Sequence, residues 1–422
     1  MLFFKIFSRL AGFSSSNKYN RKFVVEEQLG NLTPYTKAPL PEGILFDKLP
    51  DTCSVVQASL LTRHGSRNPI ISDARPIIRL KKILDDSTFP EELPPAWEFL
   101  RSWNNTLELN SLTAKGRKQS FVHGVNFRQT YNALYDPSEN FTVVVGEKDR
   151  VIESAEWFRY GFFGKSVMDS SSSLLIPEEN SVLSYITPSF SCPKWSYTDG
   201  LTAAANWSHI YLPPITQRIN TLLPTFNFTD IDIQGMLFAC PYELSRNGRS
   251  SFCSLFNPNE ILDFQYQLDM LMYYATGYGL SDNLGPILGS YYVKELVNRL
   301  TKDAAEYTNS TSLFVDFGHD TSLDFFFSAM GFFKDEPQLS AFGPRNDTRL
   351  WRTNYQVPFA ARVVTEKLLC EGELFVRIVL NGSPIRMPCS DAYGICKMVD
   401  FLNLTEWAVN VSQEDMRKIC NH

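Results

Sequence analysis

The 422-residue sequence lacks the cysteine spacing of zinc and thioredoxin-like sites, because none of its eight cysteines belongs to a C-x-x-C pair. Histidine is scarce, with five in the chain, and no cluster of His, Asp and Glu has the spacing of metal ligands. We therefore predict no metal site and no cofactor.

A basic surface and a membrane span are missing as well. The net charge is −6 and the sequence pI is about 5.6, whereas a nucleic-acid partner usually requires a basic face. No run reaches the roughly 18 uninterrupted apolar residues of a membrane span. The densest candidate, Leu323–Phe333, is too short and contains Asp324. These absences predict a soluble globular protein without a nucleic-acid partner.

The cysteines that are present are even in number, as expected for disulfides. Two close pairs, Cys240/Cys253 and Cys389/Cys396, are spaced to close short surface loops, but spacing alone leaves the other pairings open. The full set is Cys53, Cys192, Cys240, Cys253, Cys370, Cys389, Cys396 and Cys420.

Ten N-x-[ST] triplets exceed the roughly four that chance gives at this composition. With the cysteines they predict a glycoprotein of the secretory pathway, secreted or held in the cell wall. The N-terminal "MLFFKIFSRLAGFSSS" is only a weak signal segment, because Lys5 and Arg9 interrupt its apolar core. The candidate glycosylation sites are Asn31, Asn104, Asn140, Asn206, Asn227, Asn309, Asn346, Asn381, Asn403 and Asn410.

Strand and helix patterns alternate in much of the chain, which predicts an α/β sheet. Residues 1–40 are polar and irregular and are expected to form a tail. The expected strands are Ser54–Leu61, Phe141–Val145, Leu313–Val315 and Leu374–Leu380. The expected helices begin at Pro76, near Thr113 (with apolar positions Phe121, Val125 and Leu134), after Arg150 and after Asp320.

The middle of the chain has few strand signals. Long helical patterns cover Asn259–Leu280 and Pro286–Leu300. We expect residues 191–300 to form a smaller, mainly helical lobe inserted into an α/β domain of residues 41–190 and 301–422. The serine run Ser170–Ser173 is typical of a linker.

Three segments carry charged residues where a strand gives way to a helix. In an open sheet, ligands bind at the carboxyl ends of parallel strands. If these turns are neighbours, their charged side chains meet in one cleft. The residues concerned are Arg63, His64, Arg67, Arg150, His319 and Asp320.

These residue types suit phosphoryl transfer. Arginine forks match phosphate oxygens, and a helix N-terminus adds N–H donors. Clustered cations disfavour imidazolium, so His64 is expected to be neutral and nucleophilic, and its attack on a phosphomonoester gives a phosphohistidine. Asp320 is placed to protonate the leaving oxygen, and a protonated carboxyl group favours acidic pH. His319-Asp320 also fits a helix cap.

Two motifs identify a family resemblance. Arg63–Pro69 matches R-H-G-x-R-x-P, and His319-Asp320 matches the downstream H-D pair of the histidine acid phosphatases. "DRVIESAEWFRYGF" is similar to the segment around the family's third phosphate-binding arginine, and "SLTAKGRKQ" to its L-T-x-x-G-x-x-Q helix. The C-terminal "LFVRIVLNGSPIRMPCSDAYGIC" resembles fungal phytases of the family. The resemblance spans roughly residues 40–420.

The resemblance implies a role for each residue. It makes His64 the nucleophile and Asp320 the proton donor, with the phosphate held by Arg63, Arg67, Arg150 and His319. It also implies a phosphoglycerate-mutase-like three-layer fold with a helical lobe over the site. The implied disulfides are Cys53–Cys370, Cys192–Cys420, Cys240–Cys253 and Cys389–Cys396.

The implied substrate is a phosphomonoester, either phytate (myo-inositol hexakisphosphate) or a broad range of esters. Asn68 departs from the aromatic residue that many fungal phytases have here, so the sequence supports phosphatase chemistry more strongly than phytate preference. Lys81 and Lys82 form either a solvated helix face or a rim that attracts polyphosphorylated substrate.

Two other functions share part of the pattern. Phosphoglycerate-mutase-like transferases share R-H-G, but Arg67-Asn68-Pro69 and the H-D pair disfavour that assignment. The second alternative is a catalytically inactive glycoprotein that binds anions, which would require only the arginine side chains of the predicted site. Because all six site residues are present, the sequence favours the enzyme.

Overall fold

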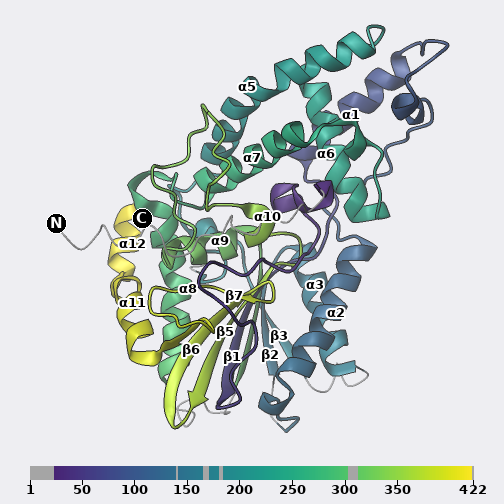
Figure 1. Cartoon of the computed structure of the whole chain (residues 1–422). Helices are drawn as coiled ribbons and strands as arrows, with labels where there is room; N and C mark the ends of the chain where they lie inside the picture. Colours follow the sequence, from purple (N-terminus) through teal and green to yellow (C-terminus); the bar gives the residue numbers. More distant parts are fainter. Residues whose placement is uncertain (1–22, 139–140, 165–170, 180–183, 303–311, 421–422) are drawn as a thin grey trace.

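A central mixed sheet organises the protein (Figure 1). The computed structural model describes residues 23–138, 141–164, 171–179, 184–302 and 312–420. The strand order is β3-β2-β4-β1-β5-β6-β7, and β8 also pairs with β6. The first four in this order are parallel, and the others pair antiparallel. The strands are β1 (Cys53–Arg63), β2 (Phe141–Gly146), β3 (Ser171–Ile176), β4 (Leu313–Gly318), β5 (Arg362–Cys370), β6 (Glu373–Leu380), β7 (Ser383–Pro384) and β8 (Ile395–Lys397).

Alternate residues of the strands face opposite helical layers, as the two-residue period of a strand requires. Leu60 packs with Val315 and Phe158 against α2 (Ala114–Thr130) and α3 (Asp149–Phe163). The next residue, Leu61, belongs to the core on the other face. Helices α8 (Leu284–Thr301), α9 (Asp320–Ala329) and α11 (Met398–Asn410) cover that face (Figure 1). The expected three-layer α/β fold is therefore confirmed.

Helices from separate parts of the chain gather beyond the carboxyl ends of the parallel strands (Figure 1). They are α1 (Ile71–Asp86), α5 (Thr198–Leu222), α6 (Asp230–Asn247) and α7 (Pro258–Ala275), with the short α10 (Thr353–Gln356) beneath them. Helix α1 approaches α6 so closely that a Cβ on Gly235 would lie 2.4 Å from the Pro76 carbonyl oxygen. The division of the chain at residues 190 and 300 stays a prediction.

Helix α1 begins five residues before its expected start at Pro76. The N–H groups of Asp73 and Ala74 already bond to the Ile70 carbonyl, so the helical backbone is established at Ile71. Pro76 lies inside the helix, and the contact with α6 stabilises the helix across it.

Three further local predictions were wrong. Leu29, Leu32 and Ala38 are buried, so the described part of the expected tail packs on the fold, and residues 1–22 lie outside the described residues. Ser171–Ser173 of the serine run belong to edge strand β3, because strand pairing uses the backbone and does not require apolar side chains, while Ser170 lies outside the described residues. Helix α2 buries Gly124 and Phe127 and leaves Phe121 exposed, because Gly124 allows α3 to approach closely.

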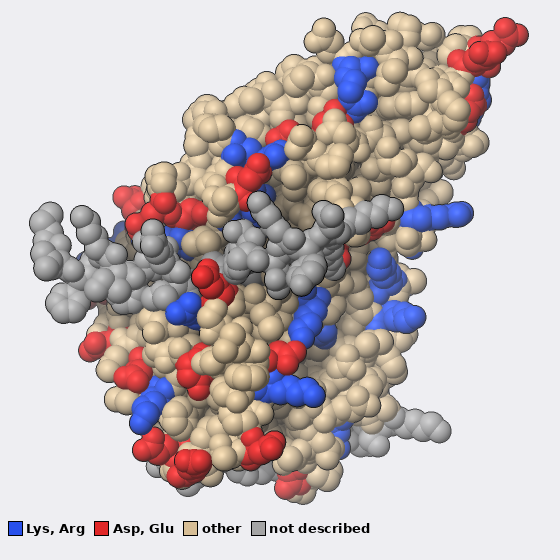
Figure 2. Space-filling model, viewed as in Figure 1, with Lys and Arg blue, Asp and Glu red and all other residues tan. Residues whose placement is uncertain are grey.

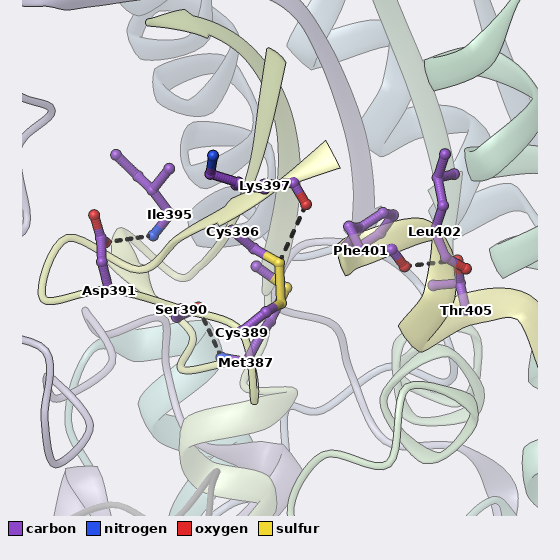
Figure 3. Close-up of a disulfide and its surroundings, with 10 residues drawn as sticks. All are labelled: Met387, Cys389, Ser390, Asp391, Ile395, Cys396, Lys397, Phe401, Leu402 and Thr405. Carbon is purple, nitrogen blue, oxygen red and sulfur yellow. Dashed lines mark hydrogen bonds between the residues drawn. A yellow bond between two sulfur atoms is a disulfide. The ribbon is translucent and has the colours of Figure 1, made fainter. Parts of the chain in front are cut away.

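All four implied disulfides are present. Cys53–Cys370 joins β1 to β5, and Cys192–Cys420 ties the C-terminal α12 (Gln413–Cys420) to the loop before α5. Figure 3 shows Cys389–Cys396, where the turn before β8 is also held by an Ile395 N–H bond to Asp391. The described part of the chain contains no free cysteine.

Acidic and basic side chains are interspersed on the face shown in Figure 2. Several pair directly, including Lys37 with Asp47 and Lys397 with Glu373. None of the helices that the structure describes is both long and apolar enough for a bilayer. The described residues likewise include no group of three His, Cys, Asp or Glu positioned for a metal ion.

Candidate active site

The register of the sheet brings the first and third motifs together. Arg63, the last residue of β1, lies opposite Gly318, the last residue of β4. The His64 N–H donates to the Gly318 carbonyl at 3.2 Å. His319 and Asp320 follow Gly318 at once, and Asp320 opens α9. The sequence prediction that these turns meet at one sheet edge is confirmed.

His64 is buried, with 1% of its surface exposed, and its ring is oriented by the backbone. Nδ1 lies 2.9 Å from the Gly65 carbonyl, so Nδ1 carries the proton that it donates there and Nε2 keeps its lone pair. Burial lowers the pKa of His64 well below its ordinary value, and Arg150, Arg63 and Arg67 lower it further. Neutral His64 is therefore available as a nucleophile at acidic pH.

The turn around His64 depends on close backbone packing. A Cβ on Gly65 would lie 2.5 Å from the Gly116 carbonyl oxygen, so a larger residue would displace α2. The Ser66 N–H donates to Gln119, and Thr113 caps α2 while bonding to Ser66. These contacts explain why the L-T-x-x-G-x-x-Q segment accompanies the first motif.

Three arginines surround His64 with buried donors. Arg63, Arg67 and Arg150 interact electrostatically with one another and with His64. The Nε atom of each is buried without a hydrogen-bond acceptor among the residues that the structure describes. Burial and the neighbouring Arg67 lower the pKa of Arg150 to about 10, so all three stay charged. Unpaired buried cationic donors are costly, and a phosphate group would satisfy them.

His319 connects Arg150 to a buried acid. Its Nε2 donates to Glu178 at 2.9 Å, and its Nδ1 accepts from Arg150 Nη2 at 3.3 Å. Burial lowers the pKa of His319, so the ring is neutral despite Glu178. Although burial alone would raise the pKa of Glu178, the hydrogen bond from His319 and nearby cations lower it. Glu178 therefore fixes the orientation of His319.

Asp320 is ionised in this site. Its Oδ2 lies 2.9 Å from Arg63 Nη2 and accepts a 3.0 Å hydrogen bond from Asn31 Nδ2. Although burial would raise the pKa of Asp320, Arg63, Arg67 and Asn31 lower it to about 2. Without substrate, Asp320 is therefore a carboxylate at moderately acidic pH, because its cationic neighbours favour the charged form. Its role as the proton donor stays a prediction.

Comparison with known proteins identifies this arrangement. The model of the histidine phosphatase superfamily, branch 2, matches residues 54–381. The chain belongs to this family. It is 30% identical to an acid phosphatase of Schizosaccharomyces pombe over 93% of this chain and 90% of that protein. It is also 30% identical to Phytase A of Aspergillus fumigatus, over 86% and 84% of the two chains.

Two solved structures share the fold of this chain. The phytase from D. castellii superimposes with a TM-score of 0.85 at 21% identity, covering 99% of this chain and 94% of that one. The multiple inositol polyphosphate phosphatase of Bifidobacterium longum, in complex with inositol hexasulfate, gives a TM-score of 0.66 at 15% identity and covers 93% and 98%.

Asn68 of the first motif is held by polar contacts with neighbouring segments. It is 1% exposed, and its Nδ2 donates to the Ser111 hydroxyl at 3.0 Å. Its Oδ1 accepts from Arg246 at 3.4 Å, and Arg246 pairs with Glu108. Asn68 therefore joins the first-motif loop to α6, and its effect on substrate preference stays a prediction.

Lys81 and Lys82 lie in the C-terminal half of α1. Each pairs with an acid one helical turn later, Asp85 and Asp86 respectively. Their role as a substrate rim stays a prediction.

Sequence reasoning missed three residues of the site. Asn31 donates to Asp320, Glu178 accepts from His319, and Asn110 accepts from Arg150 at 3.0 Å. Each lies outside the motifs. The sequon at Asn31 indicated a surface asparagine, so this signal pointed in the wrong direction.

Proposed function

We propose that this phosphomonoester hydrolase works through a phosphohistidine at His64. Nε2 of His64 attacks phosphorus, the bond from phosphorus to the ester oxygen breaks, and that oxygen takes a proton from Asp320. In the second step a water oxygen attacks phosphorus, the P–N bond breaks, and the water proton passes to the Asp320 carboxylate. The products are an alcohol, inorganic phosphate and free His64.

The observation that carries this proposal is the set of buried guanidinium Nε donors around a His64 whose Nε2 is free. Arg63, Arg67 and Arg150 would bind the phosphoryl oxygens and stabilise the charge that they carry during transfer. His319, held by Glu178, supports the same group through Arg150.

The substrate itself supports the acid step. A phosphomonoester has a second pKa of about 6 and therefore enters as a protonated monoanion below that pH. Its negative charge offsets Arg63 and Arg67, the cations that hold the pKa of Asp320 low. Asp320 can then take the substrate's proton and pass it to the leaving oxygen. We expect activity to fall above about pH 6, as the substrate loses this proton.

The substrate class is the phosphate monoester of a small alcohol. Relatives named phytase support phytate, and relatives named acid phosphatase support simpler esters. The four disulfides and the exposed candidate sites Asn104, Asn227, Asn403 and Asn410 support a location in the secretory pathway or outside the cell.

A phosphoenzyme that is stable to base would identify phosphohistidine as the intermediate. After rapid mixing with a ³²P-labelled aryl phosphate and an alkaline quench, we expect label on the wild-type protein, because phosphohistidine survives base. His64→Ala should carry no label and no activity. Label that persists in His64→Ala would contradict the proposal, as would hydrolysis by the wild type without a labelled intermediate.

A further inference from the structure

An acidic residue of α1 lies next to the proposed phosphate site. Asp73 is the third residue of α1, and its Oδ2 accepts a hydrogen bond from the Tyr242 hydroxyl. The same hydroxyl accepts from Arg67 Nη1 at 3.2 Å. A single hydroxyl group therefore separates the Asp73 carboxylate from a phosphate-binding guanidinium.

No direct ion pair neutralises Asp73 in the described part of the chain. Its hydrogen-bond partners there are two neutral hydroxyls, those of Tyr242 and Ser72. Elsewhere on α1, Arg79 pairs with Asp232 at 2.9 Å, and Lys81 and Lys82 pair with Asp85 and Asp86. Burial raises the pKa of Asp73, while the nearby Arg67 and the hydroxyls of Tyr242 and Ser72 lower it in part, so the charge of Asp73 is coupled to Arg67.

Tyr197 interacts electrostatically with both Asp73 and Asp320. This tyrosine precedes α5, and burial raises the pKa of its phenol. The charges of Asp320 and Asp73 raise that pKa further. The charges of Arg67 and Arg63 lower that pKa, so this phenol interacts electrostatically with both carboxylates and both arginines.

The positive charge of the site is sufficient for one phosphate group. Arg63 is already paired with Asp320, which leaves the charges of Arg67 and Arg150 for a bound phosphate. A second phosphate of the same substrate, lying on the side of Asp73, would meet a carboxylate instead of a cation. Like charges at such a contact reduce affinity and exclude the wrong partner.

We propose that Asp73 is a specificity-determining residue that disfavours a second phosphate beside the scissile one, so that the enzyme prefers singly phosphorylated esters to phytate. The proposal rests on the phosphohydrolase function above. It deepens that function by selecting between the two substrate classes that the family comparison leaves open.

The test compares kcat/KM for phytate and for p-nitrophenyl phosphate between about pH 4 and pH 7, because burial raises the pKa of Asp73 above its ordinary value and its charge develops as the pH rises. Asp73→Asn keeps an acceptor for Tyr242 but removes the charge. We expect it to raise the ratio of phytate to aryl phosphate activity by about tenfold. Asp73→Ser is a second neutral variant, in case the amide disturbs folding. Inhibition of aryl phosphate hydrolysis by inositol hexakissulfate should strengthen in parallel.

Two controls separate charge from positioning. Tyr242→Phe removes the bridging hydroxyl but keeps the charge of Asp73, so it should lower both activities together and leave their ratio unchanged. Asp85→Asn removes a carboxylate from the exposed part of the same helix and should change neither. An unchanged ratio in both neutral Asp73 variants overturns the proposal, as does an equal shift in Tyr242→Phe. A wild type that hydrolyses neither ester defeats the proposed function instead.

Discussion

Asp320 Oδ2 lies 2.9 Å from Arg63 Nη2, so the proposed proton donor is paired with a proposed phosphate ligand. This pair couples substrate binding to acid catalysis. In the free site Arg63 holds Asp320 ionised, and a phosphate that binds Arg63 weakens this effect. The proton is therefore delivered when the substrate is present, rather than by the pH of the solution alone.

Asp320→Asn should slow the enzyme according to the leaving group. For alkyl phosphates, whose leaving oxygens need a proton, we expect kcat to fall by about 10²–10³-fold, the usual contribution of general acid catalysis. For p-nitrophenyl phosphate the loss should be much smaller, because its phenolate leaves unprotonated. The measurement is kcat across esters of increasing alcohol pKa. Equal losses for all esters would argue that Asp320 only positions the phosphate.

Arg150 should set the lower pH limit of activity. The pKa of His64 is lowered by burial and by Arg150, so the nucleophile stays neutral and activity persists as the pH falls below 6.5. In Arg150→Gln the pKa of His64 rises, and the acidic limb of kcat/KM should move up by about one pH unit. Arg150→Lys keeps the charge, so its limb should stay in place while kcat/KM falls. A limb that does not move in Arg150→Gln would refute this role.

Glu178 should act by holding His319. In Glu178→Gln the acceptor oxygen can be replaced by an amide N–H, which disfavours the tautomer with hydrogen on Nε2. We expect kcat/KM to fall by about tenfold, comparable to the loss of other supporting contacts to a site histidine. Lys148→Met is the comparison, because Lys148 lies 3.9 Å from Glu178 and is partly exposed. If Lys148→Met has the larger effect, the charge around Glu178 matters more than its hydrogen bond.

Two candidate glycosylation sites should carry no glycan. The Nδ2 atoms of Asn31 and Asn381, which a glycan would occupy, donate to Asp320 and to the Tyr355 carbonyl. The two side chains are 4% and 0% exposed. Peptide mass spectrometry of the protein from a eukaryotic host should find glycans at exposed sites such as Asn104 and Asn403, but not at Asn31 or Asn381. A glycan at Asn31 on active protein would show that its contact with Asp320 is dispensable.

The sequence by itself determined strands β1, β2, β4 and β6 and the turns after β1 and β4, because hydrophobic patterns and turn residues act over a few positions. Arg63, His64, His319 and Asp320 could be placed at one sheet edge for this reason. The sequence did not predict β3 or β5, whose pairing depends on distant segments. The sequence could not predict contacts between distant segments. Asn31 donates to Asp320, which lies 289 positions away. Tyr242 bridges Asp73 and Arg67 only because α1 packs on α6. The protonation state of Asp320 also depended on tertiary structure, since burial and neighbouring charges set a pKa and both follow from packing.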